Sequence, residues 1–298
     1  VSLNFVSANR NTDMFTLTDL GKRFSQTEDD SDEEAELLTQ ALLSYPPATQ
    51  VLKVLSENSG YHTKFFIGAQ LGFPGEKGFT SYDEKLMIDW LSSASNTERT
   101  KIRQDIEGTS DKYARMICGW LKKLGLVTTK RIKIKKGNEE FTSFQGYSIT
   151  AKGKHAIQQA HGSSKNNRVK KYIMWEFLAT DAKNRDYVRT RRAYILKFLQ
   201  QTKSFNVLLN KLKQKGFNDD ESVIKNDIKG LNTFGLRIEH EKNTVDLKDL
   251  INDFSIPNLQ VTTVLRDEET EKRKVEFMRR TNLSPKYIEL LDIAYDGQ

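Results

Sequence analysis

The chain lacks the features that mark several large classes of protein. It has one cysteine, Cys118, among 298 residues, so a disulfide framework is impossible and a reducing cytoplasm is the natural setting. It has no apolar run of about eighteen residues and no secretory hydrophobic segment, so we expect no membrane partner. Its four histidines are scattered without metal-ligand spacing, and neither a phosphate-binding loop nor a G-x-S-x-G motif occurs.

What is present is a polar, basic chain that can still build cores. Hydrophobic residues make up 37% of the sequence, charged residues make up 29%, and the net charge is +7. The length suits two or three domains. A basic surplus of this size is compatible with a nucleic acid or an anionic membrane surface and proves neither.

The most informative segment is Glu107–Val127, EGTSDKYARMICGWLKKLGLV. Its apolar residues recur at three- and four-residue spacing and predict one buried helical stripe: Ala114, Ile117, Leu121 and Leu124. Thr109 or Ser110 can cap the start of this helix, and Gly125 can end it. Cys118 falls within the helix and reads as a small packing residue.

A basic β-hairpin follows this helix. VTTKRIKIKK and FTSFQGYSI alternate like strands around a turn at Gly137-Asn138. Lys112 and Arg115 lie off the apolar stripe, near the leading end of the helix. A helix with leading cations and a basic hairpin favours a winged-helix DNA reader. The alternative is an ordinary amphipathic helix whose Lys and Arg are solvated.

The pattern occurs three times. Leu3–Val6 with FTLTDLGKRF, and Leu124–Val127 with YSITAKGKHA, share a Thr-x-x-Gly-Lys ending, while Phe234–Arg237 with TVDLKDLI is a looser copy. Each copy predicts strand, turn, strand and then a polar helix start. Repetition at irregular, domain-sized spacing favours tandem winged-helix or helix-turn-helix subdomains over a solenoid. We therefore predict a mainly α fold with small β-hairpins, of the α+β class.

Four segments follow from these copies. We expect residues 1–27 to form the final hairpin of a first subdomain whose upstream sequence is missing. We expect residues 28–162 to form a second, DNA-reading subdomain. Within it, an acidic helix start at residues 28–36 leads to a break at Pro46 and Pro47. Residues 163–258 predict a third subdomain of three helices and a hairpin, and 259–298 a linker and the first helix of a further domain.

Several short motifs then carry a resemblance that is collinear across essentially the whole chain. They are SYPPA (44–48), LGFPGEKGFTS (71–81), EGTSDKYARM (107–116), GWLKKLGLV (119–127), YVRTRRA (187–193), NDIKGL (226–231), IPN (256–258) and YIELLDIA (287–294). They resemble the recognition portion of the FokI family of type IIS restriction endonucleases, which includes StsI.

The resemblance implies a parent enzyme that is a type II site-specific deoxyribonuclease of a bacterial cytoplasm. It implies three winged-helix-like subdomains, a linker and a C-terminal PD-(D/E)xK nuclease domain, which dimerises transiently and uses Mg²⁺ to cut outside an asymmetric, GGATG-like site. The first two subdomains would read double-stranded DNA. The third would hold the chain's own nuclease domain in check.

The base contacts are expected around the helix start. Lys112 and Arg115 can donate to guanine O6 and N7, and Glu107 can accept from a cytosine amino group. The resemblance agrees, because the family takes base contacts from the matching Glu, Lys and Arg. It adds Gln104, where the family has Asn, so the base at that step is open. The alternative for Glu107 is a helix-flanking acid or an ion pair with Arg103.

The phosphate contacts are expected on the hairpin. Ile132 and Ile134 would point inward, and the cations that would point outward are Lys130, Arg131, Lys133, Lys135 and Lys136. The alternative is a solvated basic hairpin. Lys64 is a weaker phosphate candidate. Composition alone makes Arg189, Arg191 and Arg192 a phosphate grip, but the resemblance implies helix–helix ion pairs.

No catalytic or metal-ligating residue is expected in this chain. Three Asp-x-Lys triplets occur, at Asp83–Lys85, Asp227–Lys229 and Asp246–Lys248, but none follows a Pro-Asp. The first two read as helical and the third ends a wing, so we interpret all three as accidental. Two functions from other classes stay open. They are a tandem winged-helix transcription regulator and a protein-interaction scaffold, neither of which needs a nuclease.

Overall fold

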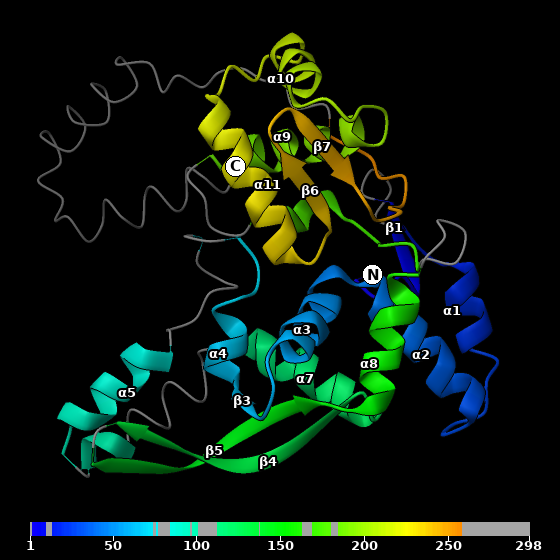
Figure 1. Cartoon of the computed structure of the whole chain (residues 1–298). Helices are drawn as coiled ribbons and strands as arrows, with labels where there is room; N and C mark the ends of the chain where they lie inside the picture. The colour runs from blue at the N-terminus through cyan, green and yellow to red at the C-terminus, as the bar shows by residue number, and fades with distance from the viewer. Residues whose placement is uncertain are drawn as a thin grey trace, which may run out of the picture. The chain divides into compact units, whose positions relative to one another are not determined.

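The computed structural model describes residues 2–9, 14–73, 76, 84–95, 97–100, 112–136, 138–162, 169–179 and 184–257. The chain divides into two units after Pro257, and all the described residues lie in the first. Helices dominate this unit, and its strands form small antiparallel sheets (Figure 1), as the sequence predicts. Within the described residues, no helix is both long and apolar enough to cross a bilayer.

The chain begins with the predicted hairpin. Strand β1 (Val6–Asn9) pairs antiparallel with β2 (Met14–Leu17), and Val6 lies opposite Leu17. Helix α1 (Asp19–Phe24) follows directly.

Two helices then meet at the predicted break. Helix α2 (Asp32–Ser44) begins after Ser31, whose side chain accepts a hydrogen bond from the N–H of Glu34, and acidic residues fill its first turn. Helix α3 (Pro46–Glu57) begins at the two prolines, which suit the first turn because they have no N–H to donate there.

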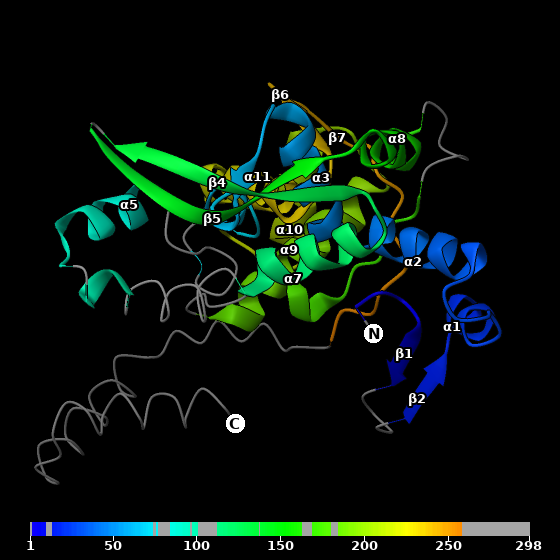
Figure 2. The ribbon, with the colours of Figure 1, turned by 90° about the horizontal axis from the view of Figure 1, so that it is seen from below.

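Helices α2 and α3 begin the second region, residues 32–160, which continues with helices around a three-stranded sheet. Its elements are β3 (His62–Thr63), α4 (Lys64–Gly68), α5 (Glu84–Ser93), α7 (Lys112–Lys123), β4 (Val127–Lys136), β5 (Glu139–Ile149) and α8 (Ala151–Ala160). The strand order is β3-β5-β4, so β3 pairs with one edge of the β4–β5 hairpin. Figure 2 shows the two long strands of this hairpin running side by side. Helices followed by such a hairpin match the predicted winged-helix pattern.

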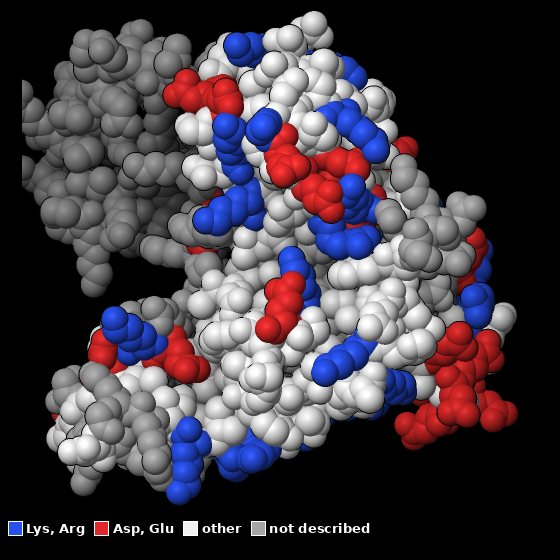
Figure 3. All heavy atoms as spheres, in the orientation of Figure 1, with Lys and Arg blue, Asp and Glu red and all other residues white. Residues whose placement is uncertain are grey.

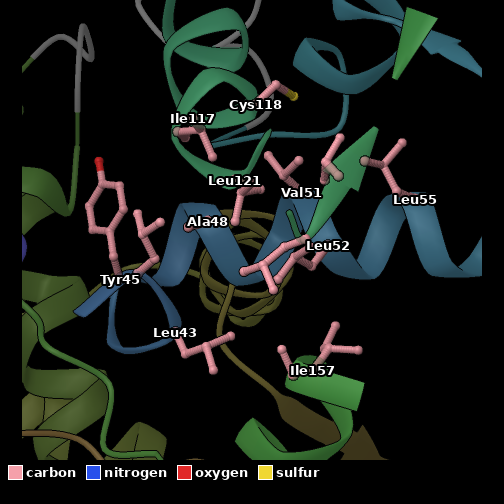
Figure 4. Close-up of a cluster of buried hydrophobic side chains, with 14 of the residues drawn as sticks. Leu43, Tyr45, Ala48, Val51, Leu52, Leu55, Ile117, Cys118, Leu121 and Ile157 are labelled. Carbon is pink, nitrogen blue, oxygen red and sulfur yellow. The ribbon is translucent and has the colours of Figure 1, made fainter. Parts of the chain in front are cut away.

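The main core lies between α3, α7, α8 and the base of this hairpin. Figure 4 shows Val51 and Leu52 of α3 beside Leu121 of α7 and Ile157 of α8. The predicted apolar stripe of α7 is confirmed, because all four of its residues are buried. Cys118 is also fully buried, and this burial raises the pKa of its thiol. The packing role predicted for Cys118 is therefore confirmed.

The first two hairpin copies share one geometry. In each, a threonine ends the hairpin, accepts a hydrogen bond from a glycine N–H three residues later, and donates its hydroxyl to the chain just before the first strand. Thr18 donates to Asn4 O, and Thr150 donates to Gly125 O over 2.7 Å. A Cβ on either Gly21 or Gly153 would collide with a carbonyl oxygen, of Phe5 or Leu126. The shared Thr-x-x-Gly sequence therefore closes the base of each hairpin.

The third copy differs from our prediction, because no helix follows its hairpin. Residues 248–257 form neither a helix nor a strand, and Ile251 makes an isolated parallel bridge to Lys171. The carboxylate of Asp249 accepts the backbone N–H of Arg237 and its Nε, which takes the place of the threonine contact. Lys171 donates its N–H to Leu250 O and accepts from the N–H of Asn252, so strand pairing satisfies the backbone here.

The third region contains the three predicted helices and their hairpin. After the short helix η2 (Trp175–Phe177) come α9 (Arg185–Leu199), α10 (Phe205–Gln214), α11 (Glu221–Phe234), β6 (Ile238–Glu241) and β7 (Thr244–Leu247). Gly235 ends α11 with a φ of +119°. A Cβ at this position would collide with the carbonyl of Pro46, so glycine lets α3 and the end of α11 meet.

The segment after α4 packs on the third region. The ring of Phe73 stacks on Phe234 with centroids 5.4 Å apart, and the Arg192 guanidinium lies 4.0 Å from the Phe73 ring centroid. Glu76 forms a buried ion pair of 2.7 Å with Arg192. A Cβ on Gly230 would lie 2.7 Å from Phe73 Cδ1, so the missing side chain makes room for the ring. The second and third regions therefore share a buried contact.

Candidate nucleic-acid interface

Helix α7 is held by its apolar stripe, which leaves its polar side outward. Arg115 lies off the stripe and is exposed, one turn into the described part of the helix. Lys112 begins α7, but its side chain lies outside the described residues, as do Gln104 and Glu107. The structure therefore places one of the four predicted base-contact side chains on an accessible helical surface.

The β4–β5 hairpin is covered on one face by α5. Val127 lies opposite Ile149 at the base, and Ile134 lies opposite Phe141 beyond an irregularity in the pairing. A second small core joins Phe65, Met87, Ile88, Leu91 and Phe144, and Ile132 and Ile134 pack against it. The inward direction predicted for these two isoleucines is confirmed, and the core they pack against comes from α4, α5 and β5.

The cations of β4 do not all share one face. Arg131 and Lys133 are exposed and alternate with the half-buried Ile132 and Ile134, as predicted. Lys130 is exposed as well, but strand alternation puts it on the same face as Ile132. Lys130 therefore points outward as predicted, but from the other face of β4 than Arg131 and Lys133. The side chains of Lys135 and Lys136 lie outside the described residues.

Lys64 contradicts its predicted role. It begins α4, as expected, but it is only 8% exposed, and its ammonium lies 5.1 Å from the centroid of the Phe65 ring. A phosphate contact needs an ammonium that DNA can reach. Lys64 begins α4 and lies over Phe65, which belongs to the small core. We therefore do not include Lys64 among the proposed phosphate contacts.

The charge distribution agrees with a basic hairpin surface. Figure 3 shows Lys and Arg side chains along the lower edge of the molecule, where Figure 1 draws β4 and β5. Lys122 and Lys123 add two exposed cations at the end of α7. The acidic start of α2 lies elsewhere, at the right of the view.

The arginines of α9 are structural. Arg191 pairs with Asp227 at 2.6 Å and with Asp219 at 2.7 Å, so its helix–helix ion pair is confirmed. Arg192 also pairs with Asp227, at 2.8 Å. Arg189 differs, because its ion pair is with Asp186 of the same helix.

The described residues give no support to a catalytic use of the Asp-x-Lys triplets. Asp227 lies in α11, and its carboxylate pairs with Arg191 and Arg192 of α9. Asp246 lies at the end of β7 and pairs with Lys248 at 2.7 Å and with Lys203 at 3.2 Å. Asp83 lies outside the described residues. In the part of the chain that the structure describes, no group of three or more His, Cys, Asp or Glu is placed to hold a metal ion.

Sequence reasoning missed one contact on this surface. The ammonium of Lys130 lies 5.1 Å from the ring centroid of Tyr61, which directly precedes β3. The two residues are far apart in the sequence, and β3 is only two residues long, so no local pattern signals the pairing.

Comparisons with known proteins point to one family. The family model described as "FokI, recognition domain, subdomain 2" matches residues 34–165, and the model described as "FokI, D3 domain" matches residues 178–243.

Two curated relatives match along nearly the whole chain. The type II restriction enzyme FokI of Planomicrobium okeanokoites is 42% identical over 302 residues, which cover 98% of this chain and 52% of that protein. The type II restriction enzyme StsI of Streptococcus sanguinis is 33% identical over 315 residues, which cover 99% of this chain and 52% of that protein. The chain thus spans about half the length of these relatives.

Solved structures agree with this fold. A structure of restriction endonuclease FokI and a structure of FokI bound to DNA each match with a TM-score of 0.80 and 38% identity, covering 98% of this chain. The match covers 52% and 51% of those two chains. The chain therefore belongs to the FokI family and spans the part that includes recognition subdomain 2 and the D3 domain.

Proposed function

We propose that this chain reads double-stranded DNA as the recognition portion of a type IIS restriction endonuclease. The observation that carries the proposal is the exposed Arg115 on α7, a helix whose opposite side is locked into the main core. An exposed helical face with a fixed back can enter a major groove in one orientation. That FokI itself has been solved with DNA supports the same reading.

The base-reading chemistry rests on Arg115, whose side chain the structure describes, and on three neighbours whose side chains it does not describe. An arginine can donate two hydrogen bonds to guanine O6 and N7, which distinguishes guanine from other bases. We assign Lys112 the same chemistry, Glu107 an acceptor role toward a cytosine amino group, and Gln104 a contact at a further base. A GGATG-like site stays part of this proposal.

The phosphate contacts are proposed for the exposed cations of the hairpin. Arg131 and Lys133 lie on the face that α5 leaves open, and Lys130 lies on the other face near the base. Lys135 keeps its predicted role as a proposal. Phosphate contacts fix register and orientation on the duplex, while base contacts supply sequence preference.

The parent protein's activity is also a proposal. We infer a site-specific deoxyribonuclease of a bacterial restriction system, acting in the cytoplasm, because the FokI and StsI relatives are type II restriction enzymes of about twice this length. Mg²⁺ would bind in a C-terminal nuclease domain that dimerises. The third subdomain, 163–258, would hold that domain in check, and the divisions at residues 27, 162 and 258 remain proposals.

Equilibrium binding at several salt concentrations tests the function. A labelled duplex carrying GGATG and a scrambled duplex are titrated with the chain, and anisotropy gives the association constant of each. We expect preference for the first duplex, and a log–log salt slope near −0.9 for each phosphate neutralised. Absence of binding at low salt would overturn the proposal in favour of a protein-interaction scaffold. If the chain binds DNA and the parent gene encodes no nuclease domain, a transcription regulator is favoured instead.

A further inference from the structure

Tyr61 and Lys130 lie together at the base of the β4–β5 hairpin. Tyr61 directly precedes β3, Lys130 belongs to β4, and β5 lies between these two strands. The Lys130 ammonium lies 5.1 Å from the centroid of the Tyr61 ring, which is a cation–π contact. The aromatic ring thus gives a flexible lysine a preferred position.

A glycine between them makes the contact possible. Lys130 lies opposite Gly146 of β5 in the strand register. A Cβ on Gly146 would lie 3.0 Å from the Cβ of Tyr61 and 2.8 Å from Cγ2 of Ile132. With no side chain on Gly146, Tyr61 can lie across β5 and reach Lys130.

Both polar groups of the pair are available to a ligand. Lys130 is exposed and Tyr61 is half-buried. Among the described residues, the Tyr61 hydroxyl makes no hydrogen bond and the Lys130 ammonium makes no ion pair. Tyr187 shows the contrasting arrangement, because its hydroxyl donates to Asp219 over 2.6 Å.

We propose that Tyr61 and Lys130 together bind one phosphate of the DNA backbone. The inference rests on the proposed function and adds a residue and a second hairpin face to it. The ammonium supplies the charge, and the phenol donates a neutral hydrogen bond to the same phosphate. Tyrosine hydroxyls and lysines are both common donors to phosphate oxygens. The neighbouring Arg131 lies on the opposite face of β4, so the base of the hairpin presents cations on both sides.

Two substitutions separate the two donors. Tyr61→Phe keeps the ring beneath the ammonium and removes only the hydroxyl, so affinity should fall about three- to tenfold on every duplex with an unchanged salt slope. Lys130→Gln removes the charge, so affinity should fall on every duplex and the magnitude of the slope should drop by about 0.9. The measurement is the same anisotropy titration with the GGATG and scrambled duplexes.

The third region offers a matched control. Lys215 lies 5.5 Å from the ring centroid of Tyr194, and the Tyr194 hydroxyl has no hydrogen-bond partner among the residues described. Tyr194→Phe and Lys215→Gln make the same chemical changes away from the proposed interface. Both variants should bind DNA like the unsubstituted chain.

The possible results separate this inference from the function beneath it. If the unsubstituted chain binds neither duplex, the proposed function and this inference both fail. If it binds and Arg115→Ala weakens binding, while Tyr61→Phe and Lys130→Gln bind normally, this inference and the phosphate role of Lys130 are overturned, and the DNA-reading function stands. A loss confined to one duplex for Lys130→Gln would also overturn it, because a phosphate contact carries no sequence preference.

Discussion

Arg192 and Asp227 form a buried ion pair in which Arg192 Nε donates to Asp227 Oδ1 over 2.8 Å. The other oxygen of the same carboxylate accepts from Arg191 Nε over 2.6 Å. Asp227 thus joins two neighbouring arginines of α9 to α11. Because Arg192 also pairs with Glu76, the node extends to the segment that follows α4.

Asp227→Asn should strongly destabilise the chain. It leaves two buried arginines without their shared negative charge, and breaking a buried pair in this way costs about 3–5 kcal/mol. Urea unfolding followed by circular dichroism measures the change. Glu221→Gln is the matched control, since the pair of Glu221 with Lys225 lies at the surface and its loss should change stability little. Equal effects of the two substitutions would contradict the prediction.

Gly153→Ala should destabilise the second region, because the added methyl group would collide with the carbonyl of Leu126. Relieving this clash requires the base of the hairpin to move, at a cost of about 1–3 kcal/mol. Gly119→Ala provides the control within α7, where nothing lies within 4 Å of the added Cβ. That change should stabilise the helix by about 0.5–1 kcal/mol. The melting temperatures of both variants test this close contact between Gly153 and Leu126. A shift in the same direction for both variants would contradict it.

Stability should rise between about pH 7 and pH 10 through Lys171. Burial lowers the pKa of this fully buried lysine to about 7, while nearby Asp249 raises it and Arg237 lowers it further. In the unfolded chain the lysine keeps its proton to about pH 10.4. Between these values the unfolded state binds more protons, so a higher pH favours the folded state.

Lys171→Met isolates this contribution, because methionine fills similar space and does not titrate. The difference in the free energy of unfolding between the two proteins, measured in urea from pH 6.5 to 9.5, should grow in favour of the unsubstituted chain as pH rises. The Lys171 ammonium also donates to Leu43 O and Thr49 Oγ1, both at 2.7 Å, and neutral lysine can keep these bonds. A pH-independent difference would rule out the lowered pKa.

Arg115→Ala and Lys133→Ala should weaken DNA binding in different ways. Loss of a guanine contact at Arg115 should cost about 1–3 kcal/mol on the preferred duplex and relax preference at one base pair. Loss of Lys133 should weaken all duplexes about equally and lower the salt slope by about 0.9. Lys213→Ala, an exposed lysine of α10, controls for net charge. A sequence-specific loss with Lys133→Ala would count against its phosphate role.

Local patterns predicted the helices well. The stripe of α7 gave that helix its buried face, and Pro46 and Pro47 placed the break between α2 and α3. These features depend on neighbouring residues alone, so spacing and backbone geometry suffice to predict them.

Tertiary partners were harder to predict. Nothing near Lys64 in the sequence shows that the small core around Phe65 and α5 will bury it. The helix predicted after the third hairpin copy does not form. Asp249 accepts from the backbone of Arg237 there, and Ile251 bridges to Lys171 from a distant segment. Among the four predicted base contacts, only the Arg115 side chain lies in the described residues, so the other three remain predictions.

The packing of Phe73 and Glu76 against α9 and α11 limits how this protein could be re-engineered. A chimaera cut near residue 162, with a third region taken from another family member, would separate both residues from the partners that enclose them. Such an exchange of specificity would need matching residues transplanted on each side of the junction, including the small one at Gly230. The second and third regions look separable along the chain, but they would have to be exchanged together with the residues of the contact between them.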